Sequence, residues 1–122
     1  RFPFGDKSID ICIFSEVLEH LSEPERAIEQ ISRCCKSVIV TTPNNTLLRR
    51  ILFRLVGRSD LVGKDHVREY SWKEVKHMFE RYGFVLKDFK GLGFISMRVH
   101  INFFPRLSAK MLMRFVGEGE KN

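Results

Sequence analysis

The chain has 122 residues, which is enough for one domain with an ordinary hydrophobic core and too few for a multidomain protein. Hydrophobic residues make up 43% and charged residues 30%, as in folded globular proteins, and no apolar run is long enough to span a bilayer. The net charge of +6 comes from residues 44–65 and 91–122, each with five basic and two acidic residues. Neither stretch is a basic stripe interleaved with aromatics or contains a nucleic-acid-reading motif, so no nucleic-acid partner is expected.

Two apolar runs with a helical pattern between them begin the chain. Residues 9–14 are β-branched and nearly all apolar, which predicts a strand covered on both faces. Ser22 and Glu25 stand at capping-box spacing before apolar positions with helical spacing, which predicts a helix over 22–35. Residues 37–42 are typical of a second buried strand. Strand, helix and strand together predict a βαβ unit in a parallel sheet.

Two basic helices are predicted further along the chain. Residues 44–65 are expected to form a basic helical insertion, and residues 103–116 a basic C-terminal helix. Their basic residues are Arg49, Arg50, Arg54, Arg106, Lys110 and Arg114. For Arg49, Arg50 and Arg54, one interpretation is a solvated helix face. The alternative is that the two helices rest on an anionic membrane or hold an acidic or lipid-linked acceptor.

One further helix and two further strands are predicted between these basic helices. Ser71 and Glu74 have capping-box spacing and open a helix with a clear apolar face. Residues 84–90 predict a strand, residues 91–93 a break, and residues 95–103 a last strand.

The three cysteines bear on the cellular compartment. Cys12, Cys34 and Cys35 are odd in number and lack C-x-x-C spacing, which argues against a disulfide framework or a zinc site and fits a reducing cytoplasm. The adjacent pair could be a redox pair or small apolar packing residues on a helix. The chain opens at Arg1 without a signal-peptide pattern, and it is expected to be cut or processed at its front.

Polar residues follow both predicted parallel strands, where open α/β sheets bind their ligands. Ser15 and Glu16 come after the first strand, Glu19 and His20 stand close behind, and Asn44 follows the second strand. A carboxylate next to an imidazole at such a place can act as a general base, a substrate clamp or half of a metal site. No metal is expected, because no second His or Cys stands at coordinating spacing.

Several stretches of the chain resemble a known family. Residues 2–11, then SEVLEHLSEPERAIEQISR and SVIVTTPN, are similar to the fourth strand, the next helix and the fifth strand of class I S-adenosylmethionine-dependent methyltransferases of the small-molecule (type 11) group. HVREYSWKEVKHMFERYGF resembles that family's segment before the sixth strand. The resemblance spans residues 2–90 and implies a Rossmann-like, doubly wound, mostly parallel α/β sheet that is truncated at its N-terminal side. Residues 1–122 would then be the C-terminal part of a single methyltransferase domain.

The resemblance also implies S-adenosylmethionine as cofactor and gives roles to individual positions. The positions that border the cofactor's methionine portion are Ser15, Glu16 and Val17. The candidate catalytic residues are His20 or His66 as base, with Glu19 as an orienting partner. The loop residues that would wall the acceptor pocket are Asn44, Arg68 and Tyr70. Structural roles remain open for three of these: Glu19 as a cap or ion pair, His20 as a packed histidine, and Asn44 as a turn residue.

Two functions follow from these expectations. The first is methyl transfer to a small-molecule or lipid-like acceptor by a cytoplasmic enzyme, peripheral at the membrane if the basic helices bind there. The family's Gly-rich loop belongs upstream of Arg1, and no G-x-G-x-G occurs here, so weak cofactor binding and little activity are expected of this chain alone. The alternative is a non-catalytic methyltransferase-like module that pairs through its exposed sheet edge, which predicts self-association.

Overall fold

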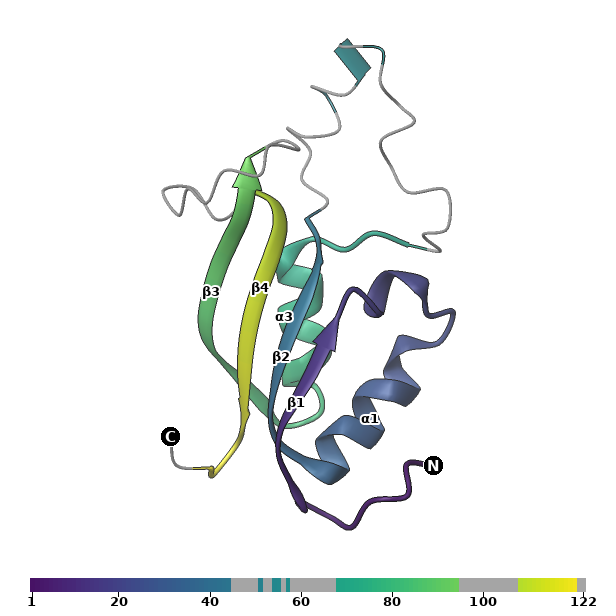
Figure 1. The fold of residues 1–122 in the computed structure, drawn as a ribbon, viewed down its shortest axis with the longest axis vertical. Helices are drawn as coiled ribbons and strands as arrows, with labels where there is room; N and C mark the ends of the chain where they lie inside the picture. Colours follow the sequence, from purple (N-terminus) through teal and green to yellow (C-terminus); the bar gives the residue numbers. More distant parts are fainter. Residues whose placement is uncertain (45–50, 52–53, 56, 58–67, 95–107, 121–122) are drawn as a thin grey trace.

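A four-stranded sheet with helices along one side forms the fold (Figure 1). The computed structural model describes residues 1–44, 51, 54, 55, 57, 68–94 and 108–120. The elements are β1 (Ile9–Ser15), the 3-10 helix η1 (Leu18–His20), α1 (Pro24–Cys34), β2 (Cys35–Pro43), α3 (Trp72–Glu80), β3 (Phe84–Phe94) and β4 (Ser108–Gly117). The strand order is β1-β2-β4-β3, with β1 and β2 parallel and β4 antiparallel to both of its neighbours. The predicted βαβ unit and Rossmann-like α/β class are confirmed.

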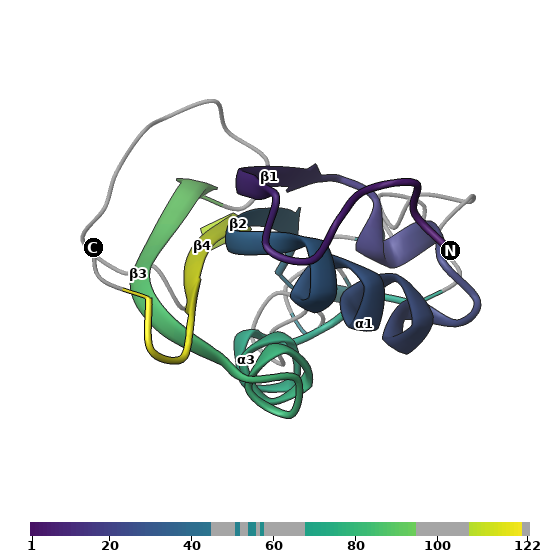
Figure 2. The same cartoon turned by 90° about the horizontal axis from the view of Figure 1, so that it is seen from below.

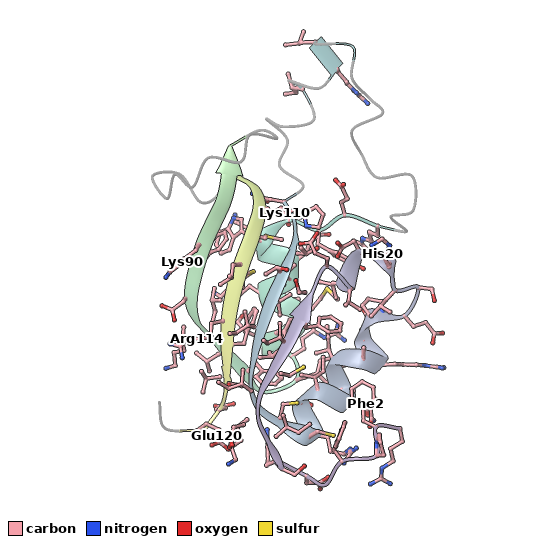
Figure 3. The ribbon with its side chains drawn as sticks, viewed as in Figure 1. Phe2, His20, Lys90, Lys110, Arg114 and Glu120 are labelled. Carbon is pink, nitrogen blue, oxygen red and sulfur yellow. The ribbon has the colours of Figure 1, made fainter. Side chains whose placement is uncertain are left out.

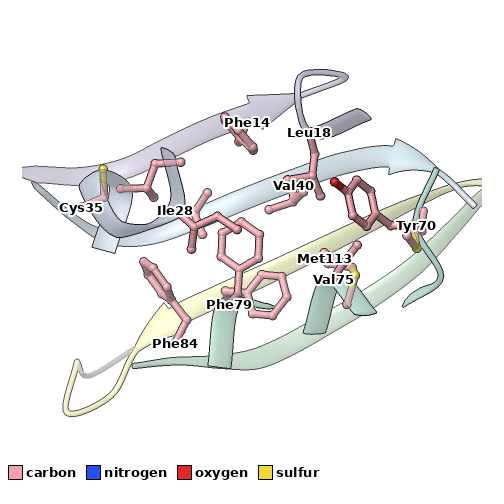
Figure 4. Close-up of a cluster of buried hydrophobic side chains, with 14 of the residues drawn as sticks. Phe14, Leu18, Ile28, Cys35, Val40, Tyr70, Val75, Phe79, Phe84 and Met113 are labelled. Atoms are coloured by element: carbon pink, nitrogen blue, oxygen red, sulfur yellow. The ribbon is translucent and has the colours of Figure 1, made fainter. Parts of the chain in front are cut away.

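The core lies between the sheet and the helices α1 and α3, which cover the same face (Figure 2). Alternate side chains of the two central strands point into it, and Val38, Val40, Met113 and Phe115 are all fully buried (Figure 4). Phe79 of α3 stacks on the Phe115 ring with 4.6 Å between centroids. This face of the sheet therefore has the apolar alternation that a covered sheet requires.

The other face of the sheet, called the open face below, carries no helix among the described residues. Strand β1 lies at an edge of the sheet, where Ile11 is 59% and Ile13 72% exposed, whereas Phe14 is buried. The prediction that this strand is covered on both faces is therefore wrong for the described part of the chain. The physical reason is that α1 and α3 lie on the same side of the sheet (Figure 2).

The predicted basic C-terminal helix over 103–116 is also wrong, because residues 108–117 form strand β4. Lys110 and Arg114 stand on this strand, and both lie on the open face because the residues between them alternate into the core. A spacing of four is even, so it places two residues on the same face of a strand just as it does on a helix. Residues 103–107 lie outside the described part of the chain.

Smaller differences concern element ends. The break expected at 91–93 is absent, because β3 continues to Phe94 with Gly91 paired to Met111. Helix α1 has Glu23 as N-cap without a side-chain cap, so the capping box expected at Ser22 is wrong, whereas the Ser71 capping box is confirmed.

Other expectations lie largely outside the described residues. This applies to the strand over 95–103 and to most of the insertion over 44–65. Within that insertion Ile51, Arg54 and Leu55 are helical. No helix in the described part of the chain is long and apolar enough to cross a membrane.

Candidate functional site

Two groups of polar side chains lie at the carboxyl ends of β1 and β2, one on each side of the sheet. Phe14 and Thr42 are buried toward the helices, so the strand alternation places Ser15 and Thr41 on the open face. The open-face cluster consists of Ser15, Glu16, Thr41 and Lys110. The buried cluster consists of Glu19, Thr42, Asn44 and Tyr70. The chain passes from one cluster to the other through η1.

Glu16 is the centre of the open-face cluster. Its backbone N–H donates to the Thr41 carbonyl oxygen at 2.9 Å, and the Thr41 hydroxyl donates to its Oε1 at 3.2 Å. Lys110 Nζ lies 3.2 Å from the other carboxylate oxygen, Oε2. Ser15 Oγ lies 2.7 Å from Thr41 Oγ1, and Ser15 is the donor there because the Thr41 proton goes to Glu16. Side chains of two strands, β2 and β4, therefore hold the two oxygens of the Glu16 carboxylate.

The backbone at Glu16 is left-handed, with φ of 53°. Residues other than glycine, asparagine and aspartate seldom adopt this conformation, because Cβ then approaches the following carbonyl oxygen. On either side of Glu16, Ser15 is exposed and Val17 is 37% exposed. The turn thus presents a hydroxyl and an apolar side chain beyond the end of β1.

Glu19 anchors the buried cluster. Its side chain is fully buried, and its Oε2 accepts a hydrogen bond from Thr42 Oγ1 at 3.1 Å. Oε1 has no hydrogen-bond partner among the described residues. The Glu19 carbonyl oxygen accepts from the Arg68 N–H at 3.3 Å, which ties η1 to the segment before α3.

Tyr70 packs against this cluster from the same segment. Tyr70 is 3% exposed, and its backbone forms a parallel bridge with the fully buried Asn44. Burial raises the pKa of the Tyr70 hydroxyl, Arg68 opposes the shift, and the carboxylates of Glu25, Glu74 and Glu19 add to it. The phenol is therefore held in its neutral form.

A cleft of about 380 Å³ opens between the N-terminal part of α1, helix α3 and the segment before α3. Its polar lining comprises Ser22, Glu25, Arg68, Tyr70, Glu74 and His77. Arg68 pairs with Glu74 at 2.8 Å and lies over the Tyr70 ring at 5.2 Å. Burial raises the pKa of Glu74, but hydrogen bonds from Ser71 and Arg68 outweigh it and leave that pKa below its usual value.

The predicted site residues are thus distributed over three places. Ser15 ends β1, Glu16 and Val17 form the turn after it, and Glu16 is held by Lys110. The Glu19 side chain is buried and hydrogen-bonded to Thr42, whereas His20 is exposed, so the two side chains have different surroundings. Their catalytic roles stay predictions.

The predicted acceptor-pocket residues are only partly accessible. Arg68 and Tyr70 both line the cleft, but Asn44 and Tyr70 are buried and Arg68 is exposed. His66 lies outside the described residues.

Three residues of these clusters were missed from the sequence. Thr41 and Thr42 were assigned to a strand end, although polar residues at that point of a parallel strand are themselves a signal. Lys110 was assigned to a helix, and no local pattern links it to Glu16.

Comparison with known proteins relates this arrangement to one enzyme group. The methyltransferase domain family matches residues 2–88. A probable S-adenosylmethionine-dependent methyltransferase of Mycolicibacterium smegmatis is 28% identical over 95 residues. The alignment covers 75% of this chain but only 35% of that protein.

Solved structures share the fold. One is the complex between the Haloferax volcanii Trm112 methyltransferase activator and a methyltransferase, with a TM-score of 0.66 at 14% identity over 100% of this chain and 59% of that one. Magnesium protoporphyrin IX methyltransferase from Synechocystis, solved with bound SAH, has a TM-score of 0.62 at 18% identity. That match covers 95% of this chain and 48% of the other.

Proposed function

Because this chain belongs to the class I S-adenosylmethionine-dependent methyltransferases, we propose that it contributes part of a methyl-transfer site, in which the turn after β1 borders the cofactor and the loop before α3 meets the acceptor. The observation that carries the proposal is the left-handed turn at Glu16, fixed at the carboxyl ends of two neighbouring parallel strands. Ligands of open α/β sheets bind at such ends. S-adenosylmethionine is the family's cofactor, and when bound it supplies a methyl group on a sulfonium.

The residues of the turn suit one side of this cofactor. Ser15 offers an exposed hydroxyl and Val17 an exposed apolar surface, while the Glu16 carboxylate is already engaged by Thr41 and Lys110. The sequence contains no G-x-G-x-G loop to hold the ribose and the methionine carboxylate. We therefore expect tight binding only when residues upstream of Arg1 supply these contacts.

The acceptor in this proposal is a small molecule. Methyl transfer is an in-line displacement, so the protein's main contribution is to position the acceptor atom. Arg68 is the loop residue best suited to touch an acceptor, because it is exposed whereas Asn44 and Tyr70 are buried. His20, exposed at the end of η1, or His66 would take the acceptor's proton.

A lipid-like acceptor and peripheral contact with an anionic membrane now depend on the 44–65 insertion alone. Lys110 and Arg114 belong to a strand and pair with Glu16 and Asp88, so they do not form a second basic helix. Binding to anionic but not neutral vesicles, lost when Arg49, Arg50 and Arg54 are replaced by Gln, would support the membrane contact. Equal binding to both vesicle types would exclude it. The cytoplasmic location stays a prediction.

Calorimetric titration with S-adenosylhomocysteine tests the proposed function. We expect weak binding to this chain and tight binding to a version extended upstream of Arg1. In the extended version Val17→Asp should weaken binding by about tenfold or more, since it places a charge against the ligand. Val85→Asp is the matched control, because Val85 is 40% exposed on the far edge strand β3. No binding by the extended version would overturn the proposal.

A non-catalytic interaction module is the second candidate function. It is favoured by the edge position of β1, whose Ile11 and Ile13 are exposed beside a strand edge that no other strand of the described residues pairs with. Sedimentation velocity should then show self-association that Ile13→Lys abolishes and Val85→Lys, on the other edge, does not. A monomeric wild-type chain at all concentrations would count against this candidate.

A further inference from the structure

We propose that Lys110 is a positioning residue, which holds the turn after β1 in the left-handed conformation that the methyl-transfer site uses. The inference rests on the proposed function for its consequence, but its structural part stands on geometry alone. Lys110 is contributed by β4, far along the chain from the turn, and Figure 3 shows it at the same end of the sheet as His20.

The conformation at Glu16 needs an external restraint. A side chain with a Cβ is strained at φ of 53°, so a free turn would relax to the extended or right-handed region. Glycine, which avoids the strain, does not occupy this position. The hydrogen bonds and the ion pair of Glu16 provide such a restraint.

Those contacts come from two strands. Thr41 of β2 holds the backbone N–H and one carboxylate oxygen, and Lys110 holds the other oxygen at 3.2 Å. The Thr41 hydroxyl has a single proton to donate, so it holds only Oε1 of the Glu16 carboxylate. With Lys110 in place the carboxylate is held at both oxygens, and rotation of the turn would break both contacts.

The pair is too exposed to act mainly through stability. The Lys110 side chain is 52% and the Glu16 side chain 36% exposed, and ion pairs in such surroundings contribute little to folding. The ion pair instead orients the turn, which exposes Ser15 and Val17 at the carboxyl end of β1, where the ligand is proposed to bind.

Lys36 provides a matched control. It also stands on a central strand of the sheet and pairs with a carboxylate, Asp10, at 2.7 Å, and its side chain is 42% exposed. Glu16 is not part of that pair. Lys110→Met and Lys36→Met therefore each remove an ion pair between a sheet lysine and a carboxylate, and only the first touches the turn.

The first measurement needs no cofactor. The three-bond HN–Hα coupling and the 13Cβ shift of Glu16 report its backbone conformation by NMR in this chain. We expect left-handed values in the wild type and in Lys36→Met, a shift toward extended values in Lys110→Met, and recovery in Lys110→Arg. Left-handed values that persist in Lys110→Met would overturn the inference.

The second measurement links the turn to function. In the version extended upstream of Arg1, Lys110→Met should raise the Kd for S-adenosylhomocysteine by about tenfold and Lys36→Met should leave it unchanged. If the turn changes but the Kd does not, the positioning role is overturned and the proposed function stands. If the wild-type extended version binds nothing, the proposed function fails together with the functional part of this inference.

Discussion

The buried carboxylate of Glu19 accepts its hydrogen bond from the hydroxyl of Thr42, at 3.1 Å, and so joins the helix after β1 to the end of β2. This contact spans the two neighbouring strand ends on the helix side of the sheet. A second threonine–glutamate contact lies at the same strand ends but on the open face, where the adjacent Thr41 donates to Glu16.

Thr42→Val should lower the free energy of unfolding by about 1–3 kcal/mol. Valine keeps the shape of the side chain but lacks the hydroxyl that donates to the buried Glu19 carboxylate. Thr41→Val should cost less, since the Glu16 carboxylate it serves is 36% exposed and water can replace the hydroxyl. Urea unfolding of both variants makes the comparison. Equal losses of stability in the two variants would contradict the idea that the buried Glu19 needs its threonine more than the more exposed Glu16 does. Adding Glu19→Gln to Thr42→Val should recover part of the loss.

The N-terminus of α3 offers a second stability test. Ser71 accepts from the Glu74 N–H, and the Glu74 carboxylate accepts from the Ser71 N–H in return. Ser71→Ala should therefore destabilise the chain by about 1 kcal/mol. Ser22→Ala is the control, because α1 has no side-chain cap and the loss should stay within about 0.5 kcal/mol. A loss at Ser22 as large as that at Ser71 would contradict the capping assignment. Thermal unfolding measures both.

Local patterns predict the elements whose sequence signals lie within a few residues of one another. The capping box at Ser71 and the apolar run of β1 specify a helix start and a strand because the signal lies within a few residues. A helix is predicted where β4 lies, because Lys110 and Arg114 stand four apart, a spacing that serves a helix face and a strand face alike. The pairing with β2 and β3 and the burial of alternate residues identify the strand.

The candidate site was predictable in part for a similar reason. The turn after β1 follows from the rule that ligands bind at strand ends, and Ser15 and Glu16 lie where that rule places them. The contact between Glu16 and Lys110 depends on the pairing of β2 with β4, which no sequence pattern specifies. The exposure of Ile13 likewise depends on what covers the open face, which is a property of the packing and not of the strand.

The thiol of Cys35 should react slowly with alkylating agents in the folded chain. Burial raises its pKa from 9.0 to about 11, with the neighbouring Cys12 adding to the shift. At pH 8 only about one thiol in a thousand would be ionised, so iodoacetamide should modify Cys35 far more slowly in the folded than in the unfolded chain. Mass spectrometry of labelled peptides measures this. Rapid folded-state labelling, or a disulfide to Cys34, would instead support the redox-pair interpretation.

The same shift gives stability a dependence on alkaline pH. A thiol whose folded pKa is raised contributes stability that is fully present below pH 9.0 and lost as the pH approaches 11. Urea unfolding should therefore show a decline over this window, and Cys35→Ala should make the decline shallower. An unchanged slope in Cys35→Ala would assign the decline to other groups.

The strain at Glu16 predicts an inversion in the usual ranking of alanine and glycine. Glu16→Ala and Glu16→Gly both lose the contacts with Thr41 and Lys110, but only alanine keeps the left-handed penalty. Glu16→Gly should therefore be the more stable of the two by about 1 kcal/mol, after allowance for the freedom glycine gives the unfolded chain. Lys36 lies within strand β2, so there Gly should be less stable than Ala by about 0.5–1 kcal/mol. Urea unfolding of the four variants decides the matter: if glycine is the worse residue at both positions, the turn does not hold Glu16 in the left-handed conformation in solution.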